Sequence, residues 1–371
     1  MHRELVIVGN GPAAWAAAAE WTRLKRSRPV VIAPNWPAVS LPGLSQVGNG
    51  RVADAAWKHE REWPADVLAG LVERVDAESG QITWRNLFAR SFSMTFGQVV
   101  VATGTRPRSW IQRSPHPRVL RLHEAADLKG WAQLRAGQRL VVVGGGLVGA
   151  EMVEMGVARG CEVEWWVREE RLWPEVLSAA GSALLLTAVA GHGVAVKFNQ
   201  TSAPGKAMDA DVVGVAIGTE AVLPEIRGMS SDRLAIAGDA AGLGSGWAYA
   251  GASGQEAVRK LCGLPIEPRA AGDFPFRASV FDEKVCAWGQ RAGAASLRFE
   301  ASVGRLHVEW SESEAGELLG LATINVPLKD KWVQNALGRK SFELSSLPEA
   351  VADPHLRAAA RRMILQTPVP C

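Results

Sequence analysis

Two glycine-rich turns, far apart in the chain, each follow a short apolar run. The first is Gly9-Asn10-Gly11-Pro12-Ala13-Ala14 after Leu5–Val8, and the second is Gly144-Gly145-Gly146-Leu147-Val148-Gly149 after Leu140–Val143. A strand that leads through such a turn into a helix directs free backbone N–H groups and the positive helix end toward a pyrophosphate, with glycine where a Cβ would collide with it. The duplication therefore predicts two bound dinucleotides.

Two further motifs strengthen this prediction by their order. Val99-Val100-Val101-Ala102-Thr103-Gly104 follows the first turn, and Leu234-Ala235-Ile236-Ala237-Gly238-Asp239 follows the second. The four motifs in this order resemble the FAD- and NAD(P)-dependent pyridine nucleotide oxidoreductases, flavoproteins that include ferredoxin reductases, nitrite reductase flavin modules and glutathione reductase. The resemblance covers residues 1 to about 265. It implies FAD on the first turn and NADPH or NADH on the second.

The resemblance predicts an α/β fold with two nested Rossmann-like dinucleotide-binding domains and a small C-terminal α+β domain. An FAD-binding domain is expected at residues 1–108 and 223–265, interrupted by an NAD(P)-binding domain at residues 109–222. Beyond Pro265 alternating apolar patterns predict strands and then helices, which form a C-terminal interface domain at residues 266–371.

Local sequence patterns predict individual elements. The proline-rich stretch Pro34–Gly50 is expected to be a loop, and a helix is expected near Ser253–Leu261, ending at Gly263. In the C-terminal domain the first strand is expected over residues 278–288.

The resemblance assigns roles to the residues of the flavin site. Gly9 would make the tight turn, Gly11 would admit the FAD pyrophosphate, and the small Ala14 would let the helix pack on the strand. Ala102-Thr103-Gly104 would lie beside the flavin, and the Asp239 carboxylate would accept hydrogen bonds from the ribityl hydroxyls.

The chain departs from the family pattern around this site. Ala33-Pro34-Asn35 stands where the family has an acidic residue that holds the adenosine ribose, so Asn35 is expected to substitute through its amide. The span from Gly218 to Gly238 is short, which predicts a more open flavin site. Trp247 and Tyr249 fall in the segment that the family folds against the isoalloxazine, with core packing as the alternative.

The second turn is expected to hold the nicotinamide dinucleotide through Gly144, Gly146 and Gly149. An NAD site normally has a carboxylate at the end of the next strand, but this chain has Val167 followed by Arg168. Arg168, with Arg171 nearby, fits a 2'-phosphate and favours NADPH over NADH. The alternative is a surface arginine paired with a neighbouring glutamate.

Hydride transfer between two rings needs their apposition more than an acid or a base. In ferredoxin reductase relatives a lysine pairs near the flavin with a glutamate that follows the second glycine turn. Glu151 is present here and is the candidate catalytic residue, whereas Gln46 stands where the lysine would be. An ordinary polar role for Glu151 in the first helical turns is the alternative.

Composition excludes several other classes of protein. A net charge of +3 without basic clusters excludes nucleic acid as a partner, and no apolar run approaches bilayer length. A first strand that begins by Glu4 leaves no room for a secretory leader, so we expect a cytoplasmic protein without a membrane partner. The fifteen tryptophans are expected mainly to serve packing.

The cysteines bear on the mechanism. The four cysteines lack metal-ligand spacing, so no metal is expected, and none of them precedes residue 161. The disulfide-reducing branch carries its redox cysteines in that first region. The chain is therefore closest to the cysteine-less ferredoxin, rubredoxin and nitrite reductase branch.

Three functions remain open from the sequence. The first is an FAD-dependent NAD(P)H oxidoreductase that passes electrons to a small redox protein. The second is an NAD(P)H oxidase or a reductase of quinones or other small molecules, and the third is a non-catalytic flavoprotein-fold subunit of a larger complex. An oligomer is compatible with all three.

Overall fold

The computed structural model describes residues 2–24, 27–34, 41–49, 63–109, 118–200, 209–229, 232–242, 246–266, 274–289, 297–338 and 346–366. The chain forms two compact units. Unit 1 comprises residues 1–108, 123–125 and 219–271, and unit 2 comprises residues 109–122, 126–218 and 272–371. Unit 2 contains most of the predicted NAD(P)-binding domain and of the predicted C-terminal domain; the three-domain boundaries themselves stay a prediction.

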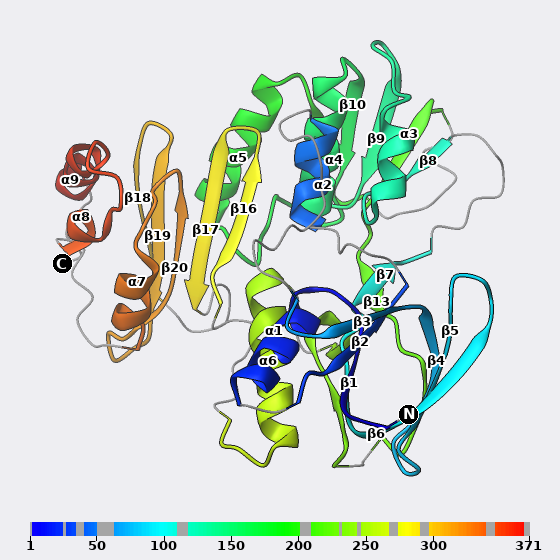
Figure 1. Ribbon diagram of the computed structural model, residues 1–371. Helices are drawn as coiled ribbons and strands as arrows, with labels where there is room; N and C mark the ends of the chain where they lie inside the picture. The colour runs from blue at the N-terminus through cyan, green and yellow to red at the C-terminus, as the bar shows by residue number, and fades with distance from the viewer. Residues whose placement is uncertain are drawn as a thin grey trace. The chain divides into compact units, whose positions relative to one another are not determined.

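Unit 1 is built on one large sheet whose central strands are parallel. Its order is β14-β4-β5-β6-β1-β2-β3, and β15 also pairs with β6. Strands β1 to β6 are labelled in Figure 1. These strands are β1 (His2–Val8), β2 (Val30–Ala33), β3 (Asp66–Ala69), β4 (Leu71–Asp76), β5 (Gln81–Arg85), β6 (Ser91–Val101), β14 (Glu225–Arg227) and β15 (Leu234–Ile236).

Both faces of β1, which lies between β6 and β2, are buried. Leu5 and Ile7 of β1 belong to one core cluster and Val6 and Val8 to another, because successive side chains of a strand point to opposite faces. This is why the second half of β1, Leu5–Val8, is an uninterrupted apolar run rather than an alternating one.

The helices α1 (Pro12–Arg23) and α6 (Trp247–Leu261) lie side by side in unit 1 (Figure 1). Small residues allow this close packing: a Cβ on Gly254 would lie 2.0 Å from the Ala13 carbonyl oxygen. Pro12 occupies the first turn of α1, where no N–H is needed for an intrahelical bond.

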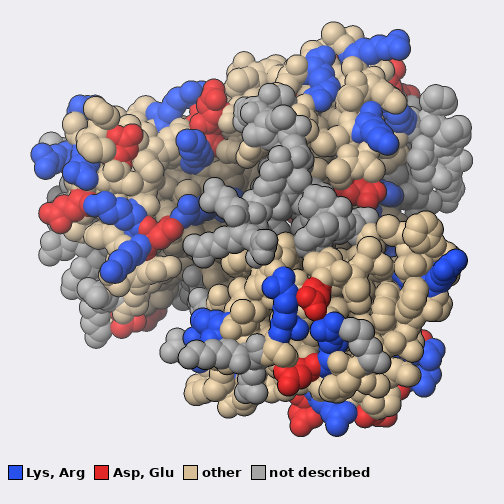
Figure 2. Space-filling model, in the orientation of Figure 1, with Lys and Arg blue, Asp and Glu red and all other residues tan. Residues whose placement is uncertain are grey.

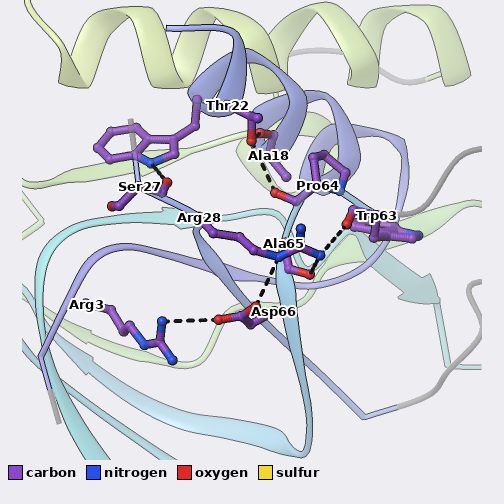
Figure 3. Close-up of polar contacts among 10 residues, drawn as sticks. Arg3, Ala18, Thr22, Ser27, Arg28, Trp63, Pro64, Ala65 and Asp66 are labelled. Atoms are coloured by element: carbon purple, nitrogen blue, oxygen red, sulfur yellow. Dashed lines mark hydrogen bonds and ion pairs between the residues drawn. The ribbon is translucent and has the colours of Figure 1, made fainter. Parts of the chain in front are cut away.

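A polar network ties together the amino-terminal ends of β1 and β3 (Figure 3). The Asp66 carboxylate accepts from Arg3 at 3.1 Å and from Arg28 at 3.0 Å, and Arg28 also donates to the Ala65 carbonyl at 3.0 Å. The glycine turn follows the opposite, carboxyl end of β1. The network therefore anchors the end of the sheet remote from the first turn.

Unit 2 contains two sheets. The first is parallel, in the order β11-β10-β9-β12-β8, and is accompanied by three helices. Its elements are β8 (Arg118–Leu120), α3 (Leu128–Trp131), β9 (Arg139–Val143), α4 (Leu147–Ala158), β10 (Glu162–Trp166), α5 (Ala179–Gly191), β11 (Ala195–Lys197) and β12 (Val212–Val215).

The second sheet of unit 2 is antiparallel, in the order β16-β17-β20-β19-β18. Buried side chains of its strands and of three helices share one core cluster. The elements are β16 (Phe276–Val280), β17 (Glu283–Gly289), β18 (Leu297–Val303), β19 (Leu306–Glu312), β20 (Leu318–Ile324), α7 (Asp330–Ala336), α8 (Leu347–Ala350) and α9 (Arg357–Gln366).

The parallel sheets confirm the predicted α/β fold class, but two local predictions were wrong. Part of the expected loop Pro34–Gly50 is the helix α2 (Leu41–Gly48), in which Leu44 is fully buried, so packing overrides the poor helix propensity of its glycine and proline. The expected strand at 278–288 is a hairpin of β16 and β17, which turns at Phe281 with φ +52°. The helix expected near Ser253 begins earlier, at Trp247.

Candidate dinucleotide sites

The first turn lies between β1 and α1 in unit 1. The Gly9 N–H donates to the Ile32 carbonyl at 2.9 Å, and Gly9 has φ +111°. A Cβ on Gly9 would lie 2.2 Å from the Ala102 carbonyl oxygen. Gly9 is therefore required by its own backbone conformation and by the strand beside it.

Gly11 meets a different requirement in the same turn. It precedes α1 with φ −77°, which any residue adopts, and a Cβ there would have no atom within 4 Å. The space next to Gly11 is open at the positive end of α1, as a pyrophosphate would need. Ala13 and Ala14 are buried against the core, as expected for small residues at the helix–strand contact.

The Ala102-Thr103-Gly104 motif directly follows β6, beside the first turn. Ala102 donates its N–H to the Val8 carbonyl at 2.8 Å. The Thr103 hydroxyl donates to the Val222 carbonyl, and Val222 donates back to the Gly104 carbonyl at 3.1 Å. This pairing holds the segment that returns from unit 2 next to the turn.

The Gly238-Asp239 motif follows β15, which pairs with β6, and lies next to the first turn. The Gly238 N–H donates to the Ser253 hydroxyl at 3.0 Å, and a Cβ on Gly238 would approach the Ala13 Cβ to 2.9 Å. The Oδ1 atom of Asp239 is buried and has no hydrogen-bond partner among the described residues. Burial raises the pKa of this carboxyl, an effect that the Gly246 N–H and His123 partly oppose.

Three other predicted residues of the flavin site have separate outcomes. Tyr249 is buried within α6, and burial raises the pKa of its phenol. Trp247 is the first residue of α6 and is half-buried. Asn35 lies outside the described residues. Their cofactor contacts stay predictions.

The second turn repeats the first geometry in unit 2. Gly144 has φ +122°, its N–H donates to the Trp166 carbonyl at 2.9 Å, and a Cβ on it would lie 2.1 Å from the Ala216 carbonyl oxygen. A Cβ on Gly149 would lie 2.0 Å from the Gly144 carbonyl oxygen, whereas one on Gly146 would have no atom within 4 Å. Gly146 thus corresponds to Gly11, and it also precedes a helix.

Apolar side chains are exposed beside this open space. Leu147 and Val148, the first residues of α4, are 40% and 39% exposed. Gly218, with φ +93°, follows β12. The glycine turn follows β9, Arg168 follows β10 and Gly218 follows β12, so all three lie at the carboxyl ends of parallel strands, where ligands bind in such sheets.

Two tryptophans that the sequence analysis did not assign also hold this turn. The Trp165 indole donates to the Gly144 carbonyl and the Trp173 indole to the Gly145 carbonyl, each at 2.8 Å. Both side chains are buried. Fifteen tryptophans without a repeat spacing gave no signal to single these two out.

The arginines expected at a 2'-phosphate are both ion-paired with neighbours. Arg168, 82% exposed, donates to the Glu169 carboxylate at 2.7 Å, and Arg171 pairs with Glu170. A Cβ on Gly145 would lie 3.3 Å from Glu169 Oε2, so this carboxylate lies against the turn. Exposed pairs of this kind contribute little free energy and exchange partners readily.

The candidate catalytic residue Glu151 lies on α4 and is half-buried. Gln46, at the position of the family's lysine, lies on α2 and is exposed. Glu151 belongs to unit 2 and Gln46 to unit 1. A catalytic role for Glu151 stays a prediction.

Surface charge, metal-ligating side chains and helix length bear on three other kinds of site. On the face drawn in Figure 2, basic and acidic side chains are interspersed. Within the described ranges no group of three or more metal-ligating side chains occurs, and Cys161, Cys262 and Cys286 are free thiols. Among those same residues, no helix combines the length and the apolar character that crossing a membrane requires.

The fold contains two glycine turns of the same geometry, each between a parallel strand and a helix. The chain belongs to the pyridine nucleotide-disulphide oxidoreductase family, which residues 3–237 match. This match confirms the superfamily predicted from the four motifs.

Similar proteins include reductases of small redox proteins. The ferredoxin–NAD(+) reductase component of the p-cumate 2,3-dioxygenase system of Pseudomonas putida is 30% identical over 176 residues, which are 43% of this chain and 42% of that protein. The chain thus matches less than half the length of this curated relative.

Solved structures share the fold over most of the chain. An NAD-dependent persulfide reductase from A. fulgidus has a TM-score of 0.78 at 17% identity, over 95% of this chain and 80% of that one. Putidaredoxin reductase, in a covalent complex with putidaredoxin, has a TM-score of 0.72 at 18% identity, over 94% and 99%.

Proposed function

We propose that this protein is an FAD-dependent oxidoreductase that takes a hydride from NAD(P)H and passes electrons to a small redox protein. The observation that carries the proposal is the repeated geometry of the two turns. In each, one glycine is forced by a neighbouring carbonyl, and a second glycine two residues on opens space at a helix start. Two pyrophosphate sites on one chain suit a flavin and a nicotinamide dinucleotide.

The first site fits FAD by its donors and acceptors. The unpartnered Asp239 Oδ1 is an acceptor left without a donor, which is costly unless a ligand supplies one. The ribityl hydroxyls of FAD are such donors, and the open space at Gly11 suits its phosphates. When bound, the flavin supplies the hydride acceptor and the route to one-electron carriers.

The chain's own residues bind and orient in this scheme. Backbone N–H groups at the start of α1 and α4 would hold the two pyrophosphates. Arg168 favours NADPH, because an exposed guanidinium can leave Glu169 for a 2'-phosphate. Glu151, on α4 after the second glycine turn, is the proposed catalytic side chain.

The cysteine pattern supports a redox protein as the acceptor. The chain has no cysteine before Cys161, so the first turn and its helix carry no disulfide that could receive electrons from the flavin. The curated relative is named as a ferredoxin reductase, and putidaredoxin reductase was solved with its redox partner. Both names support electron exit to a small iron–sulfur protein.

Anaerobic titration of the purified protein with NADPH and with NADH tests the proposal. Loss of flavin absorbance with either donor, followed by reduction of an added ferredoxin or rubredoxin, is expected. The Gly146→Val variant should keep its FAD but bleach slowly, because the new side chain occupies the open space of the second turn. Flavin that neither NADPH nor NADH bleaches would refute the proposal. Steady consumption of NADPH or NADH in air, without a protein acceptor, would indicate an oxidase.

A further inference from the structure

We propose that Trp165 and Trp173 are positioning residues that orient backbone N–H groups of the second glycine turn toward the pyrophosphate of NAD(P)H. The inference rests on the proposed function and adds to it the means by which the turn is fixed. Neither tryptophan belongs to the glycine motif, and both reach it through side-chain hydrogen bonds.

The peptide geometry of the turn carries the argument. A trans peptide unit is planar, with its N–H pointing opposite to its carbonyl. Trp165 holds the Gly144 carbonyl and Trp173 holds the Gly145 carbonyl, each at 2.8 Å. The N–H groups of the same two peptide units, those of Gly145 and Gly146, therefore point away from the buried indoles. The space next to Gly146 on that turn is open.

Three consecutive glycines need such support. Gly144, Gly145 and Gly146 carry no side chain that could limit their backbone, and glycine loses the most conformational entropy when it is ordered. Donors that are already oriented lose less freedom on binding an anion. The two indoles therefore offset a weakness that the glycines introduce.

The backbone at Trp173 indicates that its side chain is the reason for its placement. Trp173 has φ +48°, a left-handed conformation that is costly for a bulky residue. Its carbonyl accepts from Val176 at 2.9 Å and from Leu177 at 2.8 Å, which fixes this turn before α5. Glycine or asparagine would suit the backbone better, but neither would deliver an indole N–H to Gly145.

Phenylalanine variants test the role, because they keep an aromatic ring and remove only the N–H donor and part of the ring area. Trp131 is the matched control: it is 0% exposed in unit 2, and its indole donates to the Arg121 carbonyl at 2.7 Å, outside the turn. ADP-ribose is the probe, since it carries the pyrophosphate and no nicotinamide. Calorimetry on the FAD-loaded protein should show about tenfold weaker binding for Trp173→Phe and Trp165→Phe. The Trp131→Phe variant should bind as the unchanged protein does.

A kinetic measurement separates positioning from general loosening. In the two turn variants the KM for the dinucleotide should rise with little change in kcat. Rates with reduced nicotinamide mononucleotide, which lacks the pyrophosphate link, should not change. Because the two indoles hold different carbonyls, either variant alone tests the proposal if the other fails to fold.

The outcomes distinguish failure of the proposed function from failure of the inference about the two tryptophans. If the unchanged protein does not bind ADP-ribose, the proposed function fails and the inference with it. If the unchanged protein binds ADP-ribose but both turn variants bind it equally well, only the inference is overturned. An equal loss in Trp131→Phe, or an equal loss with the mononucleotide, would also overturn it.

Discussion

Gly9 and Gly11 lie two residues apart in the first turn, but they lack side chains for different reasons. Gly9 has φ +111° and would place a Cβ 2.2 Å from a carbonyl oxygen, so the fold itself requires it. Gly11 has ordinary backbone angles and open space beside it, so only a ligand would require it. A substitution at each position therefore separates stability from binding.

We expect Gly9→Ala to destabilise the apoprotein by about 2–3 kcal/mol, from the clash and the left-handed backbone. Gly11→Val should leave the unfolding of the apoprotein nearly unchanged and lower its FAD affinity at least tenfold. Thermal unfolding of the apoproteins and flavin content after reconstitution measure the two effects. Normal flavin content in Gly11→Val would argue against a pyrophosphate at this turn.

Asp239 provides a second residue-scale prediction, in which binding and stability change in opposite directions. Burial raises the pKa of this carboxyl, so the ionised form opposes folding. Below the ordinary carboxyl pKa, Asp239 is protonated in both the folded and the unfolded protein and costs no stability. As pH rises through the raised pKa, ionisation of the buried carboxyl lowers the free energy of unfolding. Asp239→Asn should therefore stabilise the apoprotein near pH 7, and the gain should shrink toward pH 4.

The same variant should lose FAD affinity, because an amide is a weaker acceptor for sugar hydroxyls than a carboxylate. Unfolding curves at several pH values and flavin titrations measure both effects. Lower apoprotein stability of Asp239→Asn at pH 7 would show that the contacts of the carboxylate with Gly246 and His123 outweigh the cost of burying it.

At the scale of elements, a buried polar contact joins the start of α5 to β19 in unit 2. Both oxygens of Glu309 accept from the Ser178 N–H, at 2.9 and 3.0 Å, at the start of α5. Glu309 Oε2 also lies 2.9 Å from His307 Nε2, and both side chains are almost fully buried. A carboxylate at the positive helix end is favourable, and its removal would leave donors without an acceptor.

Glu309→Ala should therefore destabilise the protein by about 3–5 kcal/mol, because it breaks a buried charged network from one side. Glu309→Gln keeps an acceptor for Ser178 and should cost less. Denaturant unfolding measures both, and Glu314→Gln, at an exposed carboxylate in the turn between β19 and β20, is the control. Equal costs for the alanine and glutamine variants would mean that the neutral acceptor of glutamine does not replace the carboxylate at Ser178.

Comparison of these elements with the sequence shows what could be predicted. The turns, β2 and the strands around Gly144 follow from local apolar runs and glycine spacing, which is why they were found. The Glu309–Ser178 contact joins residues 131 positions apart, and Trp173 reaches Gly145 across 28 positions. No local pattern encodes such contacts, just as none revealed that burial of Leu44 makes α2 helical.

At the scale of the whole molecule, each glycine turn lies wholly within one compact unit. Gly9, Gly11 and Asp239 belong to unit 1, and Gly144, Gly146 and Trp173 belong to unit 2. A ligand stabilises the part of the protein that binds it, by about 2.7 kcal/mol at a hundredfold excess over its dissociation constant. FAD and a nicotinamide dinucleotide should therefore act on different parts of the unfolding transition.

Calorimetry of the apoprotein with each ligand tests this consequence. FAD alone should raise the midpoint of one component by roughly 5–10 °C, and ADP-ribose alone should raise that of the other by a similar amount. The Gly11→Val variant should remove the first shift and keep the second, because its substitution lies in unit 1. A single transition that either ligand raises as a whole would show that the two units unfold cooperatively. A shift by ADP-ribose that Gly11→Val abolishes would place both ligands on the first turn and contradict the assignment of one dinucleotide to each unit.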